Sequence, residues 1–290
     1  MNNKKRLKQN SLNQILRNKV VLITGGAGSI GSSLTKKILE HPVKSVRILD
    51  IDEHALFLLG RSIKDSRLRL LLGSVIDKER IEMAGNNVDI IIHAAAIKNI
   101  EISEFNPIET VDANINGTVN MIKMAMRNKP QTFLNISTDK SVEPTTLYGT
   151  TKQIGERLTS WAGYHIKTTK FASIRLGNVF ETRGNVFEIW NDEYKNKVPL
   201  SITHPEMKRY FFHVDEAVNF IIRCIPLINE GEIFVPKMRE YSMKDLAMQI
   251  SKKHKITGLR QGEKIKEVLI TNAEKKIAKQ KNDMWIIKQY

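Results

Sequence analysis

The stretch Val20-Val21-Leu22-Ile23-Thr24-Gly25-Gly26-Ala27-Gly28-Ser29-Ile30-Gly31 decides the fold class of this chain. Its apolar first part is typical of a buried β-strand, and Leu34, Ile38 and Leu39 follow at helical spacing. Glycines between a strand and a helix allow a tight turn and let a pyrophosphate approach the positive end of the helix dipole. The stretch therefore predicts a dinucleotide-binding turn, in which the cofactor is held by Gly25, Gly28, Ser29, Ile30 and Gly31.

The same alternation of strand and helix continues as far as Leu176. Short apolar runs predict strands at 46–49, 68–72, 88–93, 133–136 and 172–176, and the segments between them predict helices at 53–64, 77–84, 106–128 and 149–162. Strands that alternate with helices pair in parallel, so we expect an α/β fold with a Rossmann-like doubly wound parallel sheet. We place an NAD(P)-binding Rossmann domain at 17–177. The remainder, 178–290, is expected to be mainly a smaller substrate-binding region, from which a helix at 214–224 can return to the sheet.

An acidic residue, Asp50, ends the second predicted strand about 20 positions after the glycine turn. A glycine triplet alone is a weak signal, but the combination with this carboxylate is strong. Asp50 can hydrogen-bond the ribose hydroxyls of the adenosine half of a dinucleotide and would repel a 2′-phosphate. We therefore expect NAD as the cofactor, with NADP as the alternative.

Two groups of polar residues follow the fifth predicted strand, at the edge where open α/β sheets bind ligands. Tyr148 and Lys152 lie four positions apart on one face of a helix. An ammonium nearby lowers the pKa of a phenol, so we expect Tyr148 to act as a base near neutral pH. Upstream, Thr138 can hydrogen-bond a sugar hydroxyl, while Asp139 and Lys140 add an acid and a base. A dehydratase needs this extra pair, because it removes a carbon-bound proton and expels water.

The composition indicates a soluble globular protein, with 41% hydrophobic and 27% charged residues among 290. No run approaches the roughly 20 apolar residues of a membrane helix, and the N-terminus lacks the apolar core of a secretory signal. The single cysteine, Cys224, cannot form an internal disulfide, which fits a reducing cytoplasm. We expect a cytoplasmic protein without an integral membrane segment.

The net charge of +15 resides mainly in the two ends of the chain. Residues 1–19 carry six Lys/Arg and no acidic residue, and residues 251–290 carry eleven against four. Residues 20–250 are nearly balanced, with 29 basic and 27 acidic side chains. A nucleic-acid groove would spread its basic residues through the folded body, so we expect no nucleic-acid partner. The basic ends are interpreted as solvated faces or contacts for an acidic partner or membrane surface, and we expect residues 1–16 to be dispensable for turnover.

Several further stretches of the sequence, together with these motifs, match the pattern of one protein family. They include Ser137-Thr-Asp-Lys140 and His204-Pro-Glu-Met-Lys-Arg-Tyr210, and shorter stretches at 24–31, 93–98, 114–118, 177–179, 182–184, 231–235 and 258–264. On these residues, from about 19 to about 270, the chain resembles the nucleotide-sugar 4,6-dehydratases of the polysaccharide-biosynthesis (CapD-like) branch of the extended short-chain dehydrogenase/reductases. The resemblance is greatest to UDP-N-acetylglucosamine 4,6-dehydratases, and the first two stretches are specific to that branch.

The resemblance implies a role for each matching residue. Asp139 corresponds to the acid that protonates the departing C6 hydroxyl, Lys140 to the base at C5, and Tyr148 to the base at O4, with Lys152 as its electrostatic partner. Thr138 corresponds to the residue that holds the sugar oxygen. The implied substrate-binding residues are Lys98, Asn178, Arg183, Arg209 and Glu263, and the implied further cofactor-binding residues are Ser74, Val75, Ala94 and Ala95.

The chain departs from the family pattern at three places. Ser74 stands where the family often has an Asp that meets adenine, and Gln261 replaces the usual proline. Many membrane-attached relatives have Met where this chain has Tyr148, so it is more similar to the soluble members that invert C5.

The resemblance implies a homo-oligomer that converts UDP-N-acetylglucosamine to a UDP-4-keto-6-deoxy sugar and uses no metal. A nucleotide-sugar 4-epimerase is the alternative, since it would use Tyr148 and Lys152 without Asp139 and Lys140. A non-catalytic NAD(P)-sensing binding protein is the alternative from another class; it would be expected to lack the Tyr/Lys pair.

Overall fold

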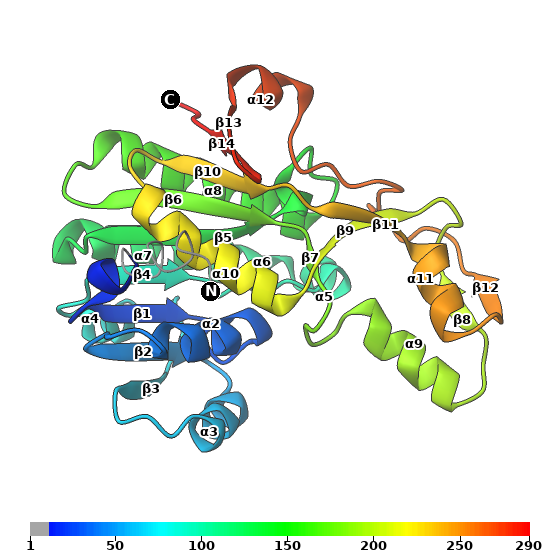
Figure 1. Cartoon of the computed structure of the whole chain (residues 1–290), viewed down its shortest axis with the longest axis horizontal. Coiled ribbons are helices and arrows are strands. Elements are labelled where there is room, and N and C mark those ends of the chain that lie inside the picture. The colour runs from blue at the N-terminus through cyan, green and yellow to red at the C-terminus, as the bar shows by residue number, and fades with distance from the viewer. Residues whose placement is uncertain (1–11) are drawn as a thin grey trace, which may run out of the picture.

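The computed structural model describes residues 12–290, and its centre is a nine-stranded sheet in the order β13-β14-β10-β6-β5-β4-β1-β2-β3 (Figure 1). The strands from β3 to β10 are paired in parallel, whereas β14 and β13 are antiparallel additions at one edge. The bounds are β1 (Val20–Thr24), β2 (Ser45–Asp50), β3 (Leu68–Leu72), β4 (Ile90–His93), β5 (Thr132–Thr138), β6 (Lys170–Leu176), β10 (Glu232–Pro236), β13 (Lys279–Lys281) and β14 (Met284–Ile287).

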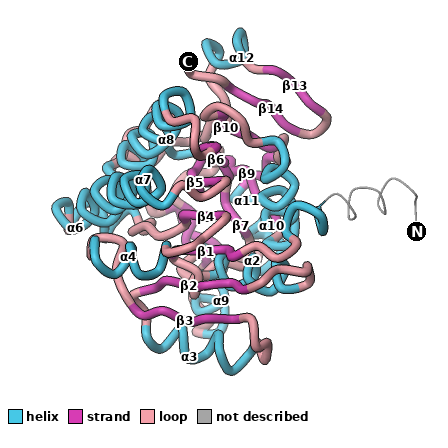
Figure 2. Tube along the Cα trace, turned by 90° about the vertical axis from the view of Figure 1, so that its left-hand side faces the viewer, coloured by secondary structure: helices cyan, strands magenta, loops and turns pink. Residues whose placement is uncertain are grey.

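Helices cover both faces of this sheet (Figure 2). Leu34, Leu56 and Phe220 belong to the core on one face, whereas Met121 and Ala162 belong to the core on the other. The first face is covered by α2 (Ser29–Leu39), α3 (Glu53–Ser62) and α10 (Val214–Cys224), and the second by α4 (Lys78–Gly85), α7 (Gly117–Asn128) and α8 (Leu147–His165). The predicted doubly wound α/β fold is confirmed.

The segment expected to be one helix at 106–128 is divided. It consists of α6 (Pro107–Val111), a π-helical turn η1 (Asp112–Asn116) and α7, and it follows a short helix α5 (Ile100–Phe105). A Cβ on Gly117 would lie 2.6 Å from Val75 Cγ2, so the absence of a side chain lets α7 approach the loop after β3. Asn114 in the π-helical turn is buried and hydrogen-bonded, and single π-helical turns often lie at functional sites.

A smaller lobe lies beyond the carboxyl ends of the parallel strands, on the right in Figure 1. It has its own core, which includes Trp190, Leu200, Phe211 and Leu246. Its elements are β7 (Asn178–Val179), α9 (Val186–Lys195), β8 (Leu200–Ile202), β9 (Lys208–Phe212), β11 (Arg239–Ser242), α11 (Met243–Ile250) and β12 (His254–Ile256), and the lobe faces the edge of the sheet where the predicted site lies.

The chain after residue 177 contributes to the main sheet as well as to this lobe. Helix α10 has the predicted bounds and packs against α2, so the expected return to the sheet is observed. Strand β10 pairs with β6, and the hairpin of β13 and β14 follows helix α12 (Asn272–Ile277). None of the helices in residues 12–290 has the length and apolarity needed to cross a bilayer.

Candidate active site

The glycine turn after β1 is packed too closely for side chains. A Cβ on Gly25, which has φ +65°, would lie 2.7 Å from the backbone of Ala95. A Cβ on Gly31 would lie 2.5 Å from the carbonyl oxygen of Gly25. Gly28 precedes α2 and provides no side-chain cap, so the first amides of α2 stay available to an anion. The turn therefore fits the pyrophosphate of a dinucleotide.

Asp50 ends β2, as predicted, and its carboxylate is attached to the glycine turn. Oδ2 accepts a hydrogen bond from the amide of Ala27 at 2.9 Å, and Oδ1 accepts one from the amide of Asp52 at 3.1 Å. Each oxygen has a further lone pair for a ribose hydroxyl. The adjacent Ile51 is 73% exposed, so apolar surface is available beside this carboxylate for a planar base.

Ser74 and Val75, two predicted cofactor residues, belong to the loop after β3. The Ser74 hydroxyl accepts a hydrogen bond from the amide of Ile76 at 3.1 Å, and Val75 is buried against Gly117. Both residues shape the loop. Ala94 and Ala95, by contrast, line the glycine turn directly, since the Ala95 amide donates to Thr24 Oγ1 at 3.3 Å.

Helix α8 brings the predicted Tyr/Lys pair to the carboxyl end of β5. The side chain of Thr146 caps α8 by accepting a hydrogen bond from the amide of Gly149. A Cβ on Gly149 would overlap the carbonyl oxygen of Lys140, so this glycine lets the first turn of α8 contact the turn η2 (Asp139–Ser141). Tyr148 therefore lies next to Asp139 and Lys140.

Turn η2 holds the predicted acid and base in direct contact. Lys140 Nζ donates to Asp139 Oδ1 at 3.1 Å and to Asn178 Oδ1 at 3.3 Å. Thr138 Oγ1 donates to the same Asp139 oxygen at 3.0 Å. The other oxygen, Oδ2, is buried and receives no hydrogen bond from any residue between 12 and 290. A buried carboxyl oxygen of this kind fits a group that acts on a ligand.

The charges around Tyr148 differ from the sequence expectation. Burial and the nearby Asp139 carboxylate raise the pKa of Tyr148, while hydrogen bonding with Thr138 opposes this. The prediction of a lowered pKa for this phenol is wrong for the ligand-free site, because burial and the Asp139 carboxylate disfavour the phenolate. Burial also lowers the pKa of Lys152 to about 8, and the Glu156 carboxylate acts in the opposite direction.

Lys152 is 7% exposed, and none of the residues described here from position 12 onward supplies a hydrogen-bond partner for its ammonium group. This side chain is a buried cation that is available to a bound ligand.

His93, on β4, is buried, and burial lowers its pKa to about 3. The neutral ring contacts Thr24 Oγ1 at 2.7 Å and Thr118 Oγ1 at 3.0 Å, so it joins β1, β4 and α7.

Two predicted substrate residues, Lys98 and Arg183, contact the cofactor side of the site. Arg183 donates from its amide to Ser29 Oγ at 3.0 Å and from its guanidinium to the Ala27 carbonyl at 3.0 Å. Lys98 Nζ donates to the Arg183 carbonyl at 2.9 Å. Burial and the adjacent Arg183 lower the pKa of Lys98. These contacts hold the loop after β7 against the glycine turn.

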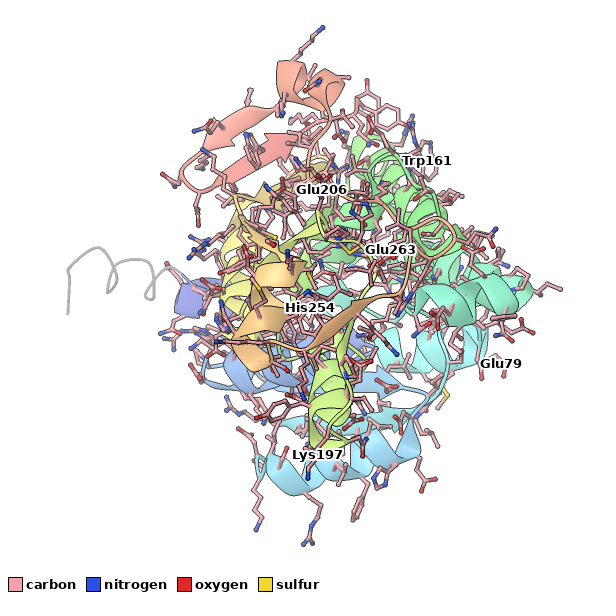
Figure 3. All side chains as sticks on the ribbon, turned by 90° about the vertical axis from the view of Figure 1, so that its right-hand side faces the viewer. Glu79, Trp161, Lys197, Glu206, His254 and Glu263 are labelled. Carbon is pink, nitrogen blue, oxygen red and sulfur yellow. The ribbon has the colours of Figure 1, made fainter. Side chains whose placement is uncertain are left out.

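The other predicted substrate residues divide into two groups. Asn178 contacts Lys140 and donates to the Tyr210 carbonyl at 3.1 Å, so it lies with the acid and base. Arg209 donates to the carbonyls of Lys264 and Ile265 and lies 3.6 Å from Glu263 Oε1, so it anchors the loop that holds Glu263. Glu263 lies near the middle of the face seen from the smaller lobe (Figure 3).

Asn114 is a site residue to which sequence reasoning assigned no role. Its Oδ1 accepts from the Ile97 amide at 2.8 Å, and its Nδ2 donates to the Ile97 carbonyl at 2.9 Å and to Thr151 Oγ1 at 3.0 Å. Asn114 therefore joins the segment after β4 to the helix that carries Tyr148. The Asn-Ile-Asn-Gly run within a predicted helix was the available signal, because these residues are poor helix formers.

The strand order 3-2-1-4-5-6, the glycine turn after β1, the carboxylate that ends β2 and the Tyr-x-x-x-Lys pair after β5 define a Rossmann-fold protein of the extended short-chain dehydrogenase/reductase class. The chain belongs to the family described as polysaccharide biosynthesis protein, whose model matches residues 21–289. The family expected from the sequence motifs is therefore confirmed.

The most similar proteins include both characterised and uncharacterised relatives. A UDP-N-acetylglucosamine 4,6-dehydratase (inverting) of Campylobacter jejuni is 35% identical, over 88% of this chain and 78% of that protein. An uncharacterized membrane protein of Methanocaldococcus jannaschii is 36% identical, over 96% of this chain and 88% of that protein. The X-ray structure of Pen from Bacillus thuringiensis superposes with a TM-score of 0.90 at 34% identity, over 94% of this chain and 88% of the other.

Proposed function

We propose that this protein is an NAD-dependent nucleotide-sugar 4,6-dehydratase that converts UDP-N-acetylglucosamine to a UDP-4-keto-6-deoxy sugar with inversion at C5. The observation that carries the proposal is the buried Asp139–Lys140 contact beside Tyr148, with Asp139 Oδ2 left without a partner among the described residues. An epimerase needs only a base at O4, whereas this pair provides acid and base chemistry at two further positions. The inverting dehydratase of C. jejuni, at 35% identity, supports the substrate and the outcome at C5.

The cofactor assignment follows from the glycine turn and Asp50. The turn and the uncapped N-terminus of α2 would hold the pyrophosphate, and Lys152 would hold a ribose hydroxyl. Asp50 would hold the adenosine ribose and repel a 2′-phosphate, which supports NAD over NADP. When bound, NAD accepts a hydride from C4 of the sugar and returns it to C6.

The residues of the chain supply the remaining chemistry. The phenolate of Tyr148, stabilised by the Lys152 ammonium, removes the O4 proton as C4 is oxidised and becomes the phenol. The 4-ketone makes the C5 proton acidic, so Lys140 can remove it. Asp139 protonates the C6 hydroxyl, which leaves as water. C5 is protonated again after hydride adds to C6, so the net change is loss of one water.

The decisive experiment is incubation of the purified protein with UDP-N-acetylglucosamine and no added cofactor, followed by NMR of the product. We expect a 4-keto-6-deoxy sugar whose C5 carries solvent deuterium when the reaction is run in heavy water. Formation of the C4 epimer alone would show that the protein is an epimerase. Absence of any conversion by protein that contains NAD would exclude this substrate.

A further inference from the structure

Arg175 on β6 is a buried charge that the proposed mechanism does not use. It is 2% exposed, and its guanidinium lies between two carboxylates from different elements. It donates to Glu156 of α8 at 3.0 and 2.8 Å and to Glu274 of α12 at 3.1 and 2.9 Å. A further bond of 2.9 Å reaches the Leu269 carbonyl. Buried charges are costly unless they are fully paired, so this cluster has fixed geometry.

Glu156 connects this cluster to the catalytic turn. Its side chain is 1% exposed, and Oε1 accepts a hydrogen bond from Ser141 Oγ at 2.9 Å. Ser141 is the last residue of η2, the turn that carries Asp139 and Lys140, and its hydroxyl also lies 2.7 Å from the Thr138 carbonyl oxygen. Glu156 is therefore tied to the segment that holds the proposed acid and base.

Glu156 also lies one helical turn after Lys152, so the two side chains project from the same face of α8. Burial lowers the pKa of Lys152 to about 8, and the Glu156 carboxylate raises it. The other titratable group coupled to Lys152 is His93 on β4, which is held neutral by burial, and Tyr148 lies one helical turn before Lys152 on α8. Glu156 is the anion whose charge favours the protonated form of Lys152.

We propose that Glu156 is a positioning residue of this active site, which fixes the η2 turn through Ser141 and lies on the face of α8 that carries Lys152, while Arg175 and Glu274 hold its carboxylate in place. The part that concerns the acid and base rests on the proposed function. The part that concerns Lys152 does not, because it can be measured without substrate. Through Glu274, a helix near the end of the chain contributes to the geometry of the site.

Two substitutions separate this role from simple structural support. Glu156→Gln and Glu274→Gln each remove one carboxylate from the same guanidinium, so both should lower the melting temperature. Only Glu156 shares a face of α8 with Lys152, so Glu156→Gln should change the titration of this lysine most. The titration is followed in the ligand-free protein by competitive acetylation with acetic anhydride across pH, with mass spectrometry of the peptide that contains Lys152.

We expect Glu156→Gln to move the Lys152 midpoint down by about one pH unit, because an adjacent opposite charge shifts a pKa by at least that amount. Glu274→Gln should move it by less than about a third of this, since Arg175 lies between the two groups. Equal shifts in both variants, or no shift in either, would overturn the assignment. If Glu156→Gln does not fold, Glu156→Asp keeps the charge and should leave the midpoint near that of the wild type; a one-unit shift in that variant would also contradict the proposal.

Ser141→Ala tests the contact with the turn. It removes the hydroxyl that bridges Glu156 and the Thr138 carbonyl but no charge, so the Lys152 midpoint should stay unchanged while kcat falls about tenfold and KM changes little. Unchanged kcat would show that Ser141 does not position η2. If the wild type fails to convert UDP-N-acetylglucosamine, the proposed function fails, while the acetylation of Lys152 still decides the role of Glu156.

Discussion

The two oxygens of Asp139 have different surroundings, and this difference decides how the acid–base pair can act. Oδ1 accepts hydrogen bonds from Lys140 and Thr138, whereas the buried Oδ2 is free of partners within residues 12–290. In the proposed reaction, Oδ2 would face the leaving hydroxyl while Oδ1 keeps its contact with Lys140. Asn178 Oδ1 accepts a second hydrogen bond from Lys140 Nζ at 3.3 Å, which orients the amine from the other side.

The first prediction separates the steps of the reaction. Lys140→Ala removes the proposed C5 base, and Asp139→Asn keeps the shape but cannot donate a proton from a carboxyl group. Each should lower formation of the 4-keto-6-deoxy product by about 10²–10⁴-fold while still allowing the first oxidation. Tyr148→Phe should instead block that oxidation. NADH absorbance in a single turnover and deuterium incorporation at C5 distinguish the two classes of variant.

The outcome for Lys140 is the most informative one. C5 exchange at the wild-type rate in Lys140→Ala would assign the base to another residue, and Tyr148 would then be the next candidate because it lies beside the same turn.

The second prediction concerns cofactor choice. Asp50→Asn keeps an oxygen that can accept from the Ala27 amide but removes the charge, so the glycine turn should stay in place. We expect weaker NAD binding and at least about a tenfold relaxed discrimination against NADP, because repulsion of the 2′-phosphate is lost. Equilibrium binding of both dinucleotides to the purified protein measures the ratio. An unchanged ratio, or wild-type protein that prefers NADP, would contradict the role assigned to Asp50.

The residues that sequence reasoning located well are those with local signals. Asp50, Tyr148 and Asp139 lie at strand ends or at the start of a helix, where a strand-and-helix pattern fixes the position. Arg183 has no such signal, since its contacts with Ser29 and Ala27 join segments more than 150 positions apart. Arg209 was likewise assigned by resemblance, and the structure shows that its guanidinium is occupied by carbonyl groups of another loop.

At the level of elements, the predictable strands were those with continuous apolar runs. β1 and β4 are fully buried, so their sequences are apolar up to the last residue, Thr24 or His93, and identify them directly. The hairpin strand β13, Lys279–Lys281, is exposed at every position and pairs only with β14, so its composition resembles a loop. Its conformation depends on the docking of β14 against β10, which is a tertiary contact.

Helix α8 offers a matched test of how an element positions the site. A Cβ on Gly149 would overlap the Lys140 carbonyl, whereas a Cβ on Gly155 would meet only Asn135 Nδ2, at 3.5 Å. Gly149→Ala should therefore displace η2 from the first turn of α8, with about 1–3 kcal/mol of lost stability and a large loss of turnover. Gly155→Ala should be neutral or stabilising by up to about 1 kcal/mol, since alanine is the better helix former.

Thermal melts and turnover of the two alanine variants measure this difference. Equal effects would show that the contact between α8 and η2 tolerates movement, and the close approach at Gly149 would then have no catalytic importance.

For the whole molecule, His93 predicts how stability depends on pH. Its pKa in the folded state is about 3, below the ordinary value of 6.5, so the unfolded chain binds the extra proton. The stabilisation from the neutral ring is fully present above pH 6.5 and is lost progressively as pH falls toward 3. Between pH 7.5 and pH 5 this amounts to about 2 kcal/mol for the one residue.

Urea unfolding at the two pH values measures the slope. His93→Gln should be less stable than the wild type at pH 7.5, because hydrogen bonds to Thr24 and Thr118 are altered, yet it should lose less stability on going to pH 5. His54→Gln, at an exposed position, is the control and should retain the wild-type slope. An unchanged slope in His93→Gln would mean that other groups dominate the pH dependence.

The last prediction places the boundary between the folded body and the basic N-terminal segment. Charge alone suggests that residues 1–16 can be removed, and residues 1–11 lie outside the described part of the chain. The described part adds packing to this argument, because Leu16 is fully buried in the same core as residues of α2 and α10, and Asn13 Oδ1 lies 2.6 Å from His41 Nδ1. Removing 1–11 deletes basic charge, whereas removing 1–16 also deletes core contacts.

We therefore expect the truncation of 1–11 to keep the melting temperature and turnover of the full chain. The truncation of 1–16 should lose about 2–5 kcal/mol, the usual cost of deleting a buried leucine side chain. Leu16→Ala in the full chain should reproduce most of that loss while leaving all basic residues in place, which separates packing from charge. A large loss of turnover in the shorter truncation, with an unchanged melting temperature, would instead assign the basic segment a role in the reaction or in binding its acidic substrate.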